Sequence, residues 1–148
     1  MRVPELGVSH SVAIPVDARF TVPGLLPQIP SWAAMPPVLA TAMLVAVMEW
    51  AALETLLPYL DQNERSLGTL VDMTHTAPTP VGVVVRATAT IRAVDGRFVD
   101  FDIEASDENG VVGRARHRRA VIEMDRFATR IAGLQTAPPG QAGSGKPT

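Results

Sequence analysis

The chain has 148 residues, of which 47% are hydrophobic and 19% are charged, and its formal net charge is −2. This length predicts one globular domain with a real core, and the near-neutral charge offers no general attraction to nucleic acid or anionic lipid. The absence of cysteine excludes disulfides, thiolate chemistry and cysteine-bound zinc. The amino terminus, MRVPELGVSHS, lacks an apolar signal core, so we expect a cytoplasmic location.

The first 37 residues predict one strand followed by a covering segment. Val12 and Ile14 alternate with Ser11 and Ala13, which indicates a short strand within residues 8–16. Residues 17–37, DARFTVPGLLPQIPSWAAMPP, are too apolar for a solvated linker. We predict a long loop packed over an apolar site, called the lid segment below, although a covering loop without a gating role fits the same composition.

Residues 37–57, PVLATAMLVAVMEWAALETLL, form an almost wholly apolar run with Glu49 in its middle. Ala, Leu and Met favour a helix, which Pro58 cannot continue. A helix that is apolar all round belongs either to a core or to a membrane. The uncharged part, residues 32–48, contains two prolines, so its helical portion falls short of the roughly 20 residues that a bilayer requires. We therefore predict a core helix clasped by a curved sheet.

Glu49 is the first candidate for chemistry. Its helical neighbours three, four and seven positions away are all apolar: Ala42, Val45, Ala46, Ala52, Leu53 and Leu56. A carboxylate among aliphatic groups is costly unless it is hydrogen-bonded or serves as an acid, base or nucleophile. The pattern therefore indicates either a buried polar contact or a catalytic group.

Four further strands are predicted as a meander, at residues 66–76, 83–92, 99–105 and 111–124. A three-residue turn between the second and third would pair Ile91 with Phe101 and Arg92 with Asp100. The same rule at the next turn sets Asp102 near Arg114 on a solvated face. The last strand changes its inward parity around residues 117–119, which predicts a bulge there.

The carboxyl-terminal residues complete the predicted domain. The tail, GLQTAPPGQAGSGKPT, is rich in Pro, Gly and Ser and has little to bury. We therefore predict a single domain over residues 1–132 and a disordered tail over residues 133–148. The elements together indicate an α+β fold with an antiparallel sheet around one helix.

Other candidate side chains carry weak signals on their own. His75 lies between two threonines late in a predicted strand, and Thr41 lies near the helix start; both patterns are also typical of structural hydrogen bonds. The three histidines, His10, His75 and His117, make a poor metal set, so no metal site is predicted. No P-loop, dinucleotide glycine pattern, nucleophile elbow or HExxH motif occurs.

Several blocks of the sequence resemble the hotdog-fold thioesterases related to fluoroacetyl-CoA thioesterase. The resemblance spans about residues 32–127 and is densest in LATAMLVAVMEWA, LLPYL, SLGTLVDMTHTAPTPVG and RRAVIEMDRF. It implies a hotdog fold, in which an antiparallel sheet wraps around one long central helix, and hydrolysis of an acyl-CoA thioester. It also implies a homodimer with sites at the interface, and no cofactor beyond the coenzyme A of the substrate.

The same resemblance assigns roles to individual residues. Thr41, Glu49 and His75 fall on the family's catalytic threonine, glutamate and histidine. Gly68 falls on a glycine that lines the acyl site, and Arg119 falls on an arginine near the coenzyme A end, where Arg116 or Arg118 would join it at the phosphates.

Two questions stay open at this stage. In one regular helix Thr41 and Glu49 are roughly 12 Å apart along the axis, so either Thr41 lies at a frayed helix start or two chains share a site.

Trp32 and Met35 replace lid phenylalanines of the fluoroacetyl-specialised members, so we expect a short or modified acyl group without fluoroacetyl selectivity. The alternative function is a non-hydrolytic protein of this fold that binds acyl-CoA or another small ligand.

Overall fold

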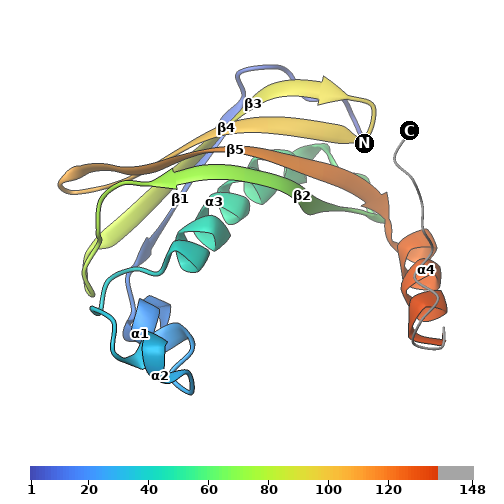
Figure 1. The fold of residues 1–148 in the computed structure, drawn as a ribbon. Coiled ribbons are helices and arrows are strands. Elements are labelled where there is room, and N and C mark those ends of the chain that lie inside the picture. Colours follow the sequence, from blue (N-terminus) through green and yellow to red (C-terminus); the bar gives the residue numbers. More distant parts are fainter. Residues whose placement is uncertain (137–148) are drawn as a thin grey trace.

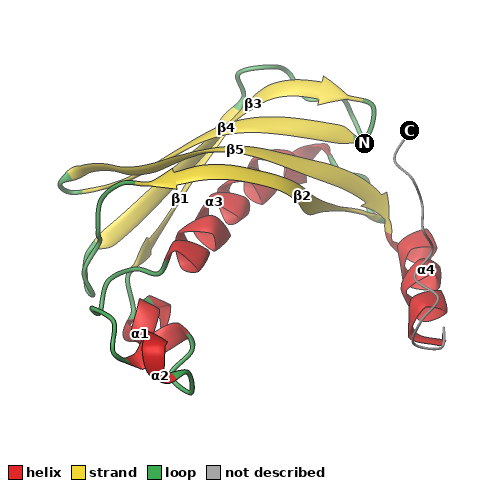
Figure 2. Cartoon of the chain, viewed as in Figure 1, coloured by secondary structure: helices red, strands yellow, loops and turns green. Residues whose placement is uncertain are grey.

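The computed structural model describes residues 1–136 of the chain. An antiparallel sheet arches over one long helix, α3 (Thr41–Leu56), as Figures 1 and 2 show. Its strands are β1 (Ser9–Pro15), β2 (Glu64–His75), β3 (Val84–Asp95), β4 (Phe98–Asp107) and β5 (Gly110–Glu123). The predicted architecture, an antiparallel sheet wrapped around a central helix, is confirmed.

The order of strands in the sheet is β1-β3-β4-β5-β2. The predicted four-strand meander is therefore wrong at its first step, because β2 pairs with β5 and not with β3. Helix α3 lies between β1 and β2 in the chain, and these two strands form opposite edges of the sheet. As a result, β2 is an edge strand within the described chain.

Helix α3 packs one face against the sheet, mainly on β1 and β3. Small side chains allow a close approach, since Ala51 and Ala52 of the helix and Ala87 and Ala89 of β3 are completely buried. By length and composition alone, residues Thr41–Tyr59 could cross a bilayer. Their buried face belongs to the protein core, as expected for a core helix.

The opposite face of α3 is open in this single chain. Ala42 and Ala46 are exposed, and Trp50 is 40% exposed. The core helix is thus buried on one side only in a single protomer. An apolar helix face in contact with solvent is unfavourable, and such a face is typical of a surface that a ligand or another chain covers.

The helix also begins later than predicted, at Thr41. Val38 and Leu39 form isolated strand-like bridges to Pro80 and Thr21, which hold the preceding residues extended. Ala40 is the N-cap and offers no capping side chain. Thr41 therefore lies in the first turn, where helical N–H groups have no intrahelical partner.

The pairing of β3 with β4 is partly as predicted. Ile91 pairs with Phe101, but Ala93 rather than Arg92 lies opposite Asp100. The extra residue forms a bulge at Arg92 rather than in the turn, where Asp95 pairs directly with Phe98. The Arg92 guanidinium still lies 3.9 Å from the Asp100 carboxylate.

The predicted partner of Asp102 was Arg114, and this is wrong, because the partner is the next residue along β5 on the same face of the sheet. Asp102 pairs with Arg116, and Glu104 pairs with Arg114 through a 2.9 Å ion pair. The turn between β4 and β5 is tight, since Asp107 pairs with Gly110, and the bulge lies later, beside Ala105. The charged ladder therefore exists, with partners shifted along the strand.

Short helices fill the connections. The lid segment contains η1 (Ala18–Phe20), α1 (Val22–Leu25) and α2 (Pro30–Ala33), and it lies at the amino-terminal end of α3 (Figure 1). Helix η2 (Leu57–Tyr59) follows α3, and α4 (Met124–Thr136) follows β5 and projects from the sheet. Helix α4 includes residues 133–136 of the predicted disordered tail, while residues 137–148 lie outside the described part of the chain.

Candidate active site

Thr41 and His75 meet at the amino-terminal end of α3. Thr41 is the first residue of the helix, His75 is the last residue of β2, and Thr41 Oγ1 lies 2.9 Å from His75 Nδ1. The other ring nitrogen of His75, Nε2, is buried and has no hydrogen-bond partner among residues 1–136. Buried nitrogens are rarely left unpaired, so Nε2 is available for a ligand atom.

The protonation of His75 follows from its surroundings. Burial lowers the pKa of His75 from the ordinary value of 6.5, and the backbone of Ala77 opposes this effect more weakly. Desolvation penalises the charged imidazolium, so the neutral ring is favoured near pH 7. A neutral imidazole can accept a proton and later release it.

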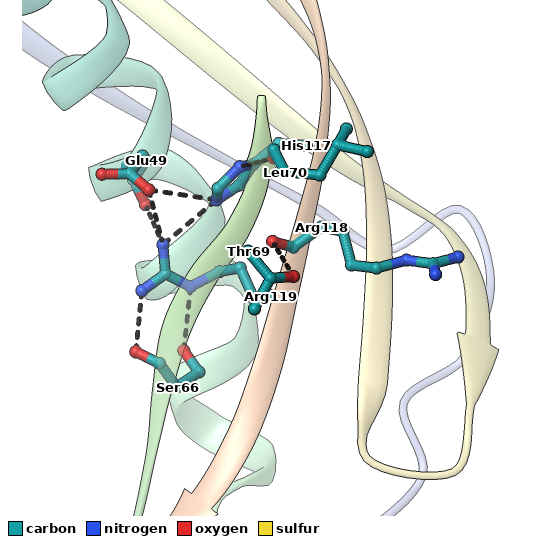
Figure 3. A network of polar contacts seen from close by, with 7 residues as sticks. All are labelled: Glu49, Ser66, Thr69, Leu70, His117, Arg118 and Arg119. Carbon is teal, nitrogen blue, oxygen red and sulfur yellow. Dashed lines mark hydrogen bonds and ion pairs between the residues drawn. The ribbon is translucent and has the colours of Figure 1, made fainter. Parts of the chain in front are cut away.

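Glu49 lies near the middle of α3 and faces two side chains of β5 (Figure 3). Its Oε1 atom is 3.8 Å from Arg119 Nη1 and 3.6 Å from His117 Nε2. The sequence predicted only aliphatic groups around the Glu49 carboxylate. This is wrong, because His117 and Arg119 approach it from the sheet. Its side chain is 39% exposed, which leaves the carboxylate accessible to substrate and water.

Arg119 is a buried cation with fixed geometry. Its Nε donates to Ser66 Oγ at 2.9 Å, and its Nη2 donates to the Ser66 carbonyl at 2.8 Å. Its Nη1 lies 3.2 Å from His117 Nε2 and is the nitrogen nearest to Glu49. The structure thus places Arg119 inside the sheet's concave face, next to the carboxylate. By contrast, Arg118 points to the other face and pairs with Asp100 at 2.7 Å.

Gly68 leaves space for the Glu49 carboxylate. A Cβ atom added at this position would overlap Glu49 Oε1 and would lie 3.0 Å from His117 Cε1. Gly68 is opposite Arg119 in the β2–β5 pairing, so both contribute to the same face of the sheet. The absence of a side chain here is therefore what allows Glu49 to approach the strand.

A bulge at Thr69 changes which residues of β2 point inward. The pairing with β5 shifts between Gly68 and Leu70, so Thr69 is the extra residue. Before the bulge, Gly68 pairs with the inward Arg119; after it, Val71 pairs with the inward His117. Without this shift, alternation would turn His75 to the outer face, away from Thr41.

The predicted bulge in β5 is wrong, and the error hid a site residue. Gly113, Ala115, His117, Arg119 and Val121 are all buried and keep one parity along the strand. The irregularity lies in β2, opposite them. A change of parity at residues 117–119 leaves the direction of His117 undefined, so the sequence offers it only as a member of a poor metal set. The unbroken alternation from Gly113 to Val121 was the signal that places His117 inside.

The site residues expected from the sequence thus form two clusters. One contains Thr41 and His75, and the other contains Glu49, Gly68 and Arg119. No hydrogen bond or ion pair within residues 1–136 joins the two clusters.

Trp32 and Met35 lie in and just after the lid helix α2, where Trp32 is half-buried and Met35 is 50% exposed. Among residues 1–136, no group of three or more His, Asp or Glu side chains is arranged to hold a metal ion.

Comparison with known proteins places this geometry in context. A family described as fluoroacetyl-CoA-specific thioesterase matches residues 28–125. A fluoroacetyl-CoA thioesterase from Streptantibioticus cattleyicolor is 40% identical over 131 residues, which cover 88% of this chain and 92% of that protein.

Solved structures show the same fold. A mutant of a fluoroacetyl-CoA-specific thioesterase in complex with fluoroacetate and CoA is 39% identical, with a TM-score of 0.81 over 84% of this chain and 99% of that one. A hot-dog-like protein from Thermanaerovibrio acidaminovorans, at 22% identity, has a TM-score of 0.77 over 90% of this chain and 94% of that one.

Proposed function

The chain belongs to the fluoroacetyl-CoA-specific thioesterase family, and we propose that it hydrolyses a short or modified acyl-CoA by means of Thr41, Glu49 and His75. It is a hotdog-fold acyl-CoA thioesterase. The observation that supports these three residues most directly is that the bulge at Thr69 turns His75 to the face of β2 on which Gly68 approaches Glu49. The bulge therefore places His75 on the same face of β2 as Gly68, which contacts Glu49.

The proposed reaction adds water across the thioester carbonyl. The Thr41 hydroxyl and the unpaired N–H groups of the first α3 turn would bind the carbonyl oxygen as it gains negative charge. Glu49, whose Oε1 lies 3.8 Å from Arg119 Nη1, would act in one of two ways. It would attack the carbonyl carbon, expel the coenzyme A thiolate and form an anhydride that water then hydrolyses, or it would remove a proton from the water that attacks the carbonyl. His75 would accept a proton and donate it to the departing thiolate, which leaves as coenzyme A.

We further propose that two protomers share each site. Thr41 and Glu49 are eight residues apart in one continuous helix, about 12 Å along its axis, which is too far for one small acyl group. The exposed face of α3 and the edge strand β2 lie next to this gap. On β2, Leu67, Leu70 and Val71 are all exposed, as expected for a strand that pairs with a second chain.

Leu70→Lys is expected to convert dimers into monomers and to reduce hydrolysis in parallel. Leu70 is 51% exposed on β2, and a lysine there would place charge on the proposed interface. Val84→Lys is the matched control, since Val84 is 48% exposed on β3, which pairs with β1 and β4 and belongs neither to this edge nor to α3. Sedimentation and thiol release measure the two effects. A monomeric Leu70→Lys protein with full activity would contradict the shared site.

The pH profile should show that neutral His75 is needed. Because burial lowers the pKa of His75, the neutral ring persists as the pH falls through 6.5. We therefore expect the acid limb of kcat/KM to have its midpoint below pH 6.5. Measurement of thiol release across pH 5 to 9 gives this midpoint. A midpoint clearly above pH 6.5 would exclude His75 as the titrating group.

The substrate test is thiol release from a panel of acyl-CoAs, from acetyl and fluoroacetyl to medium-chain and aromatic groups. We expect a clear preference for one acyl class, without selectivity for fluoroacetyl over acetyl, because Trp32 and Met35 stand where specialised members carry phenylalanine. Rates near background across the panel would argue against the proposed substrate class. We also propose a cytoplasmic location.

A further inference from the structure

His117 is a buried histidine that the proposed reaction does not use. It is 2% exposed and lies on the inner face of β5, with its ring 6.4 Å from that of Phe101. Both of its nitrogens have partners: Nδ1 lies 2.8 Å from the Leu70 carbonyl, and Nε2 lies 3.2 Å from Arg119 Nη1. It therefore has no free nitrogen with which to exchange protons with a substrate.

These two partners determine the state of the ring. A carbonyl oxygen only accepts, so Nδ1 must carry the proton. A guanidinium only donates, so Nε2 must be the bare acceptor. Both contacts require the same neutral tautomer. A proton on Nε2 would face the Arg119 cation at 3.2 Å, which is closer than the Glu49 carboxylate at 3.6 Å.

The contact with Arg119 completes the support of that cation. Ser66 accepts hydrogen bonds from Nε and Nη2 and so fixes one edge of the guanidinium. The remaining nitrogen, Nη1, faces Glu49: it lies 3.2 Å from His117 Nε2 and also donates a longer hydrogen bond, of 3.5 Å, to the Glu49 backbone carbonyl. His117 thus contacts the guanidinium at the nitrogen that meets the Glu49 carboxylate (Figure 3).

The contact with Leu70 acts on the other cluster of the site. Leu70 immediately follows the Thr69 bulge, and Thr69 Oγ1 donates to the Arg118 carbonyl at 3.2 Å. Two side-chain hydrogen bonds thus hold the bulge, one from Thr69 itself and one from His117 to the following residue, Leu70. Its shift of one residue is what turns His75 inward toward Thr41.

We propose that His117 is a positioning residue that links the two clusters: its Nε2 holds Arg119 against Glu49, and its Nδ1 secures the bulge that orients His75. This inference rests on the proposed function, because its kinetic consequence is a change in thioester hydrolysis. It also makes a prediction about the ring itself that does not depend on catalysis.

Two substitutions separate the two contacts. In His117→Asn the amide nitrogen can occupy the place of Nδ1, so the bond to Leu70 is kept and the acceptor for Arg119 is lost. In His117→Gln the amide oxygen can reach the place of Nε2, so the acceptor is kept and the bond at the bulge is lost. Each of the two variants is therefore the matched control for the other.

We expect kcat to fall about 10- to 100-fold in His117→Asn, with KM little changed, because a displaced guanidinium no longer meets Glu49 correctly. His117→Gln should recover part of this loss. The melting temperature should follow the opposite order, with Asn above Gln, because only Asn keeps the bulge bond. If activity instead follows the melting temperature in both variants, His117 has only a structural role and the proposal is overturned.

Two further measurements distinguish this inference from the proposed function. Nitrogen-15 NMR of the wild-type ring should show a proton on Nδ1 and none on Nε2 at neutral pH; any other state overturns the proposal even if no thioester is hydrolysed. In an Arg119→Lys background, His117→Asn should cause less than a threefold further loss of kcat. An additional loss as large as in the wild-type background would show that His117 does not act through Arg119. A wild-type protein inactive on all thioesters would refute the proposed function alone.

Discussion

Replacement of Glu49 by glutamine is expected to lower thioester hydrolysis about 10²- to 10⁴-fold, the range for loss of a general acid or base. Glutamine has nearly the same shape but can neither attack a carbonyl as an anion nor remove a proton from water. Coenzyme A binding should persist, because Glu49 faces the reacting end of the site. Thiol release and calorimetric titration with coenzyme A measure the two effects separately.

Glu54→Gln on the same helix is the matched control. The Glu54 carboxylate accepts a hydrogen bond from Trp50 Nε1 at 3.0 Å and does not contact Arg119 or His117 in the described chain. The same chemical change there should leave turnover within about twofold of wild type, as is usual for a surface substitution. Undiminished hydrolysis by Glu49→Gln would sink the assignment of Glu49 and favour another nucleophile or base.

Gly68→Ala is the second substitution for which a large effect is expected. The new methyl group would overlap Glu49 Oε1, which is the end of a flexible side chain, so the carboxylate would move and the backbone would not. We expect kcat to fall on the order of 100-fold, since a misplacement of about 1 Å can cost that much. The melting temperature should change little, because Glu49 can swing into the open side of the site.

Gly113→Ala tests the opposite case in the same pair of strands. A Cβ atom there would lie 2.5 Å from the Thr74 backbone carbonyl, which cannot move without disturbing the β2–β5 pairing. We expect this variant to lose about 1–3 kcal/mol of unfolding free energy, as for other overpacked positions. If Gly68→Ala keeps full activity, or loses as much stability as Gly113→Ala, the close approach of Glu49 to β2 is not what turnover requires.

Local patterns were sufficient for much of the fold. The alternation of Val85, Ala87 and Ala89 with polar residues predicted β3, and the apolar run around Glu49 predicted α3. Both signals arise from short-range geometry, because a strand repeats every two residues and a helix about every 3.6. The resemblance to the thioesterases then identified the chemistry, which composition and motifs could not supply.

Other features depend on pairing between distant segments. The place of β2 in the sheet is one example, because no pattern in residues 64–75 indicates that this strand pairs with β5 rather than β3. Helix α4 was not predicted: the last strand was expected to end at residue 124 and the disordered tail to begin at residue 133, with no element assigned between them. The registers at Arg92 and Asp102 were wrong because a bulge can lie within a strand as easily as in its turn.

The sequence by itself determined the five strands, the apolar helix that carries Glu49, and the family to which the chain belongs. Only the tertiary structure decided that His117 and Arg119 face inward and that Thr69 is the extra residue that turns His75 toward Thr41. The physical reason is that the direction of a side chain on a strand depends on register. Register is set by hydrogen bonds to a partner strand about 50 residues away, where one added residue reverses every side chain that follows.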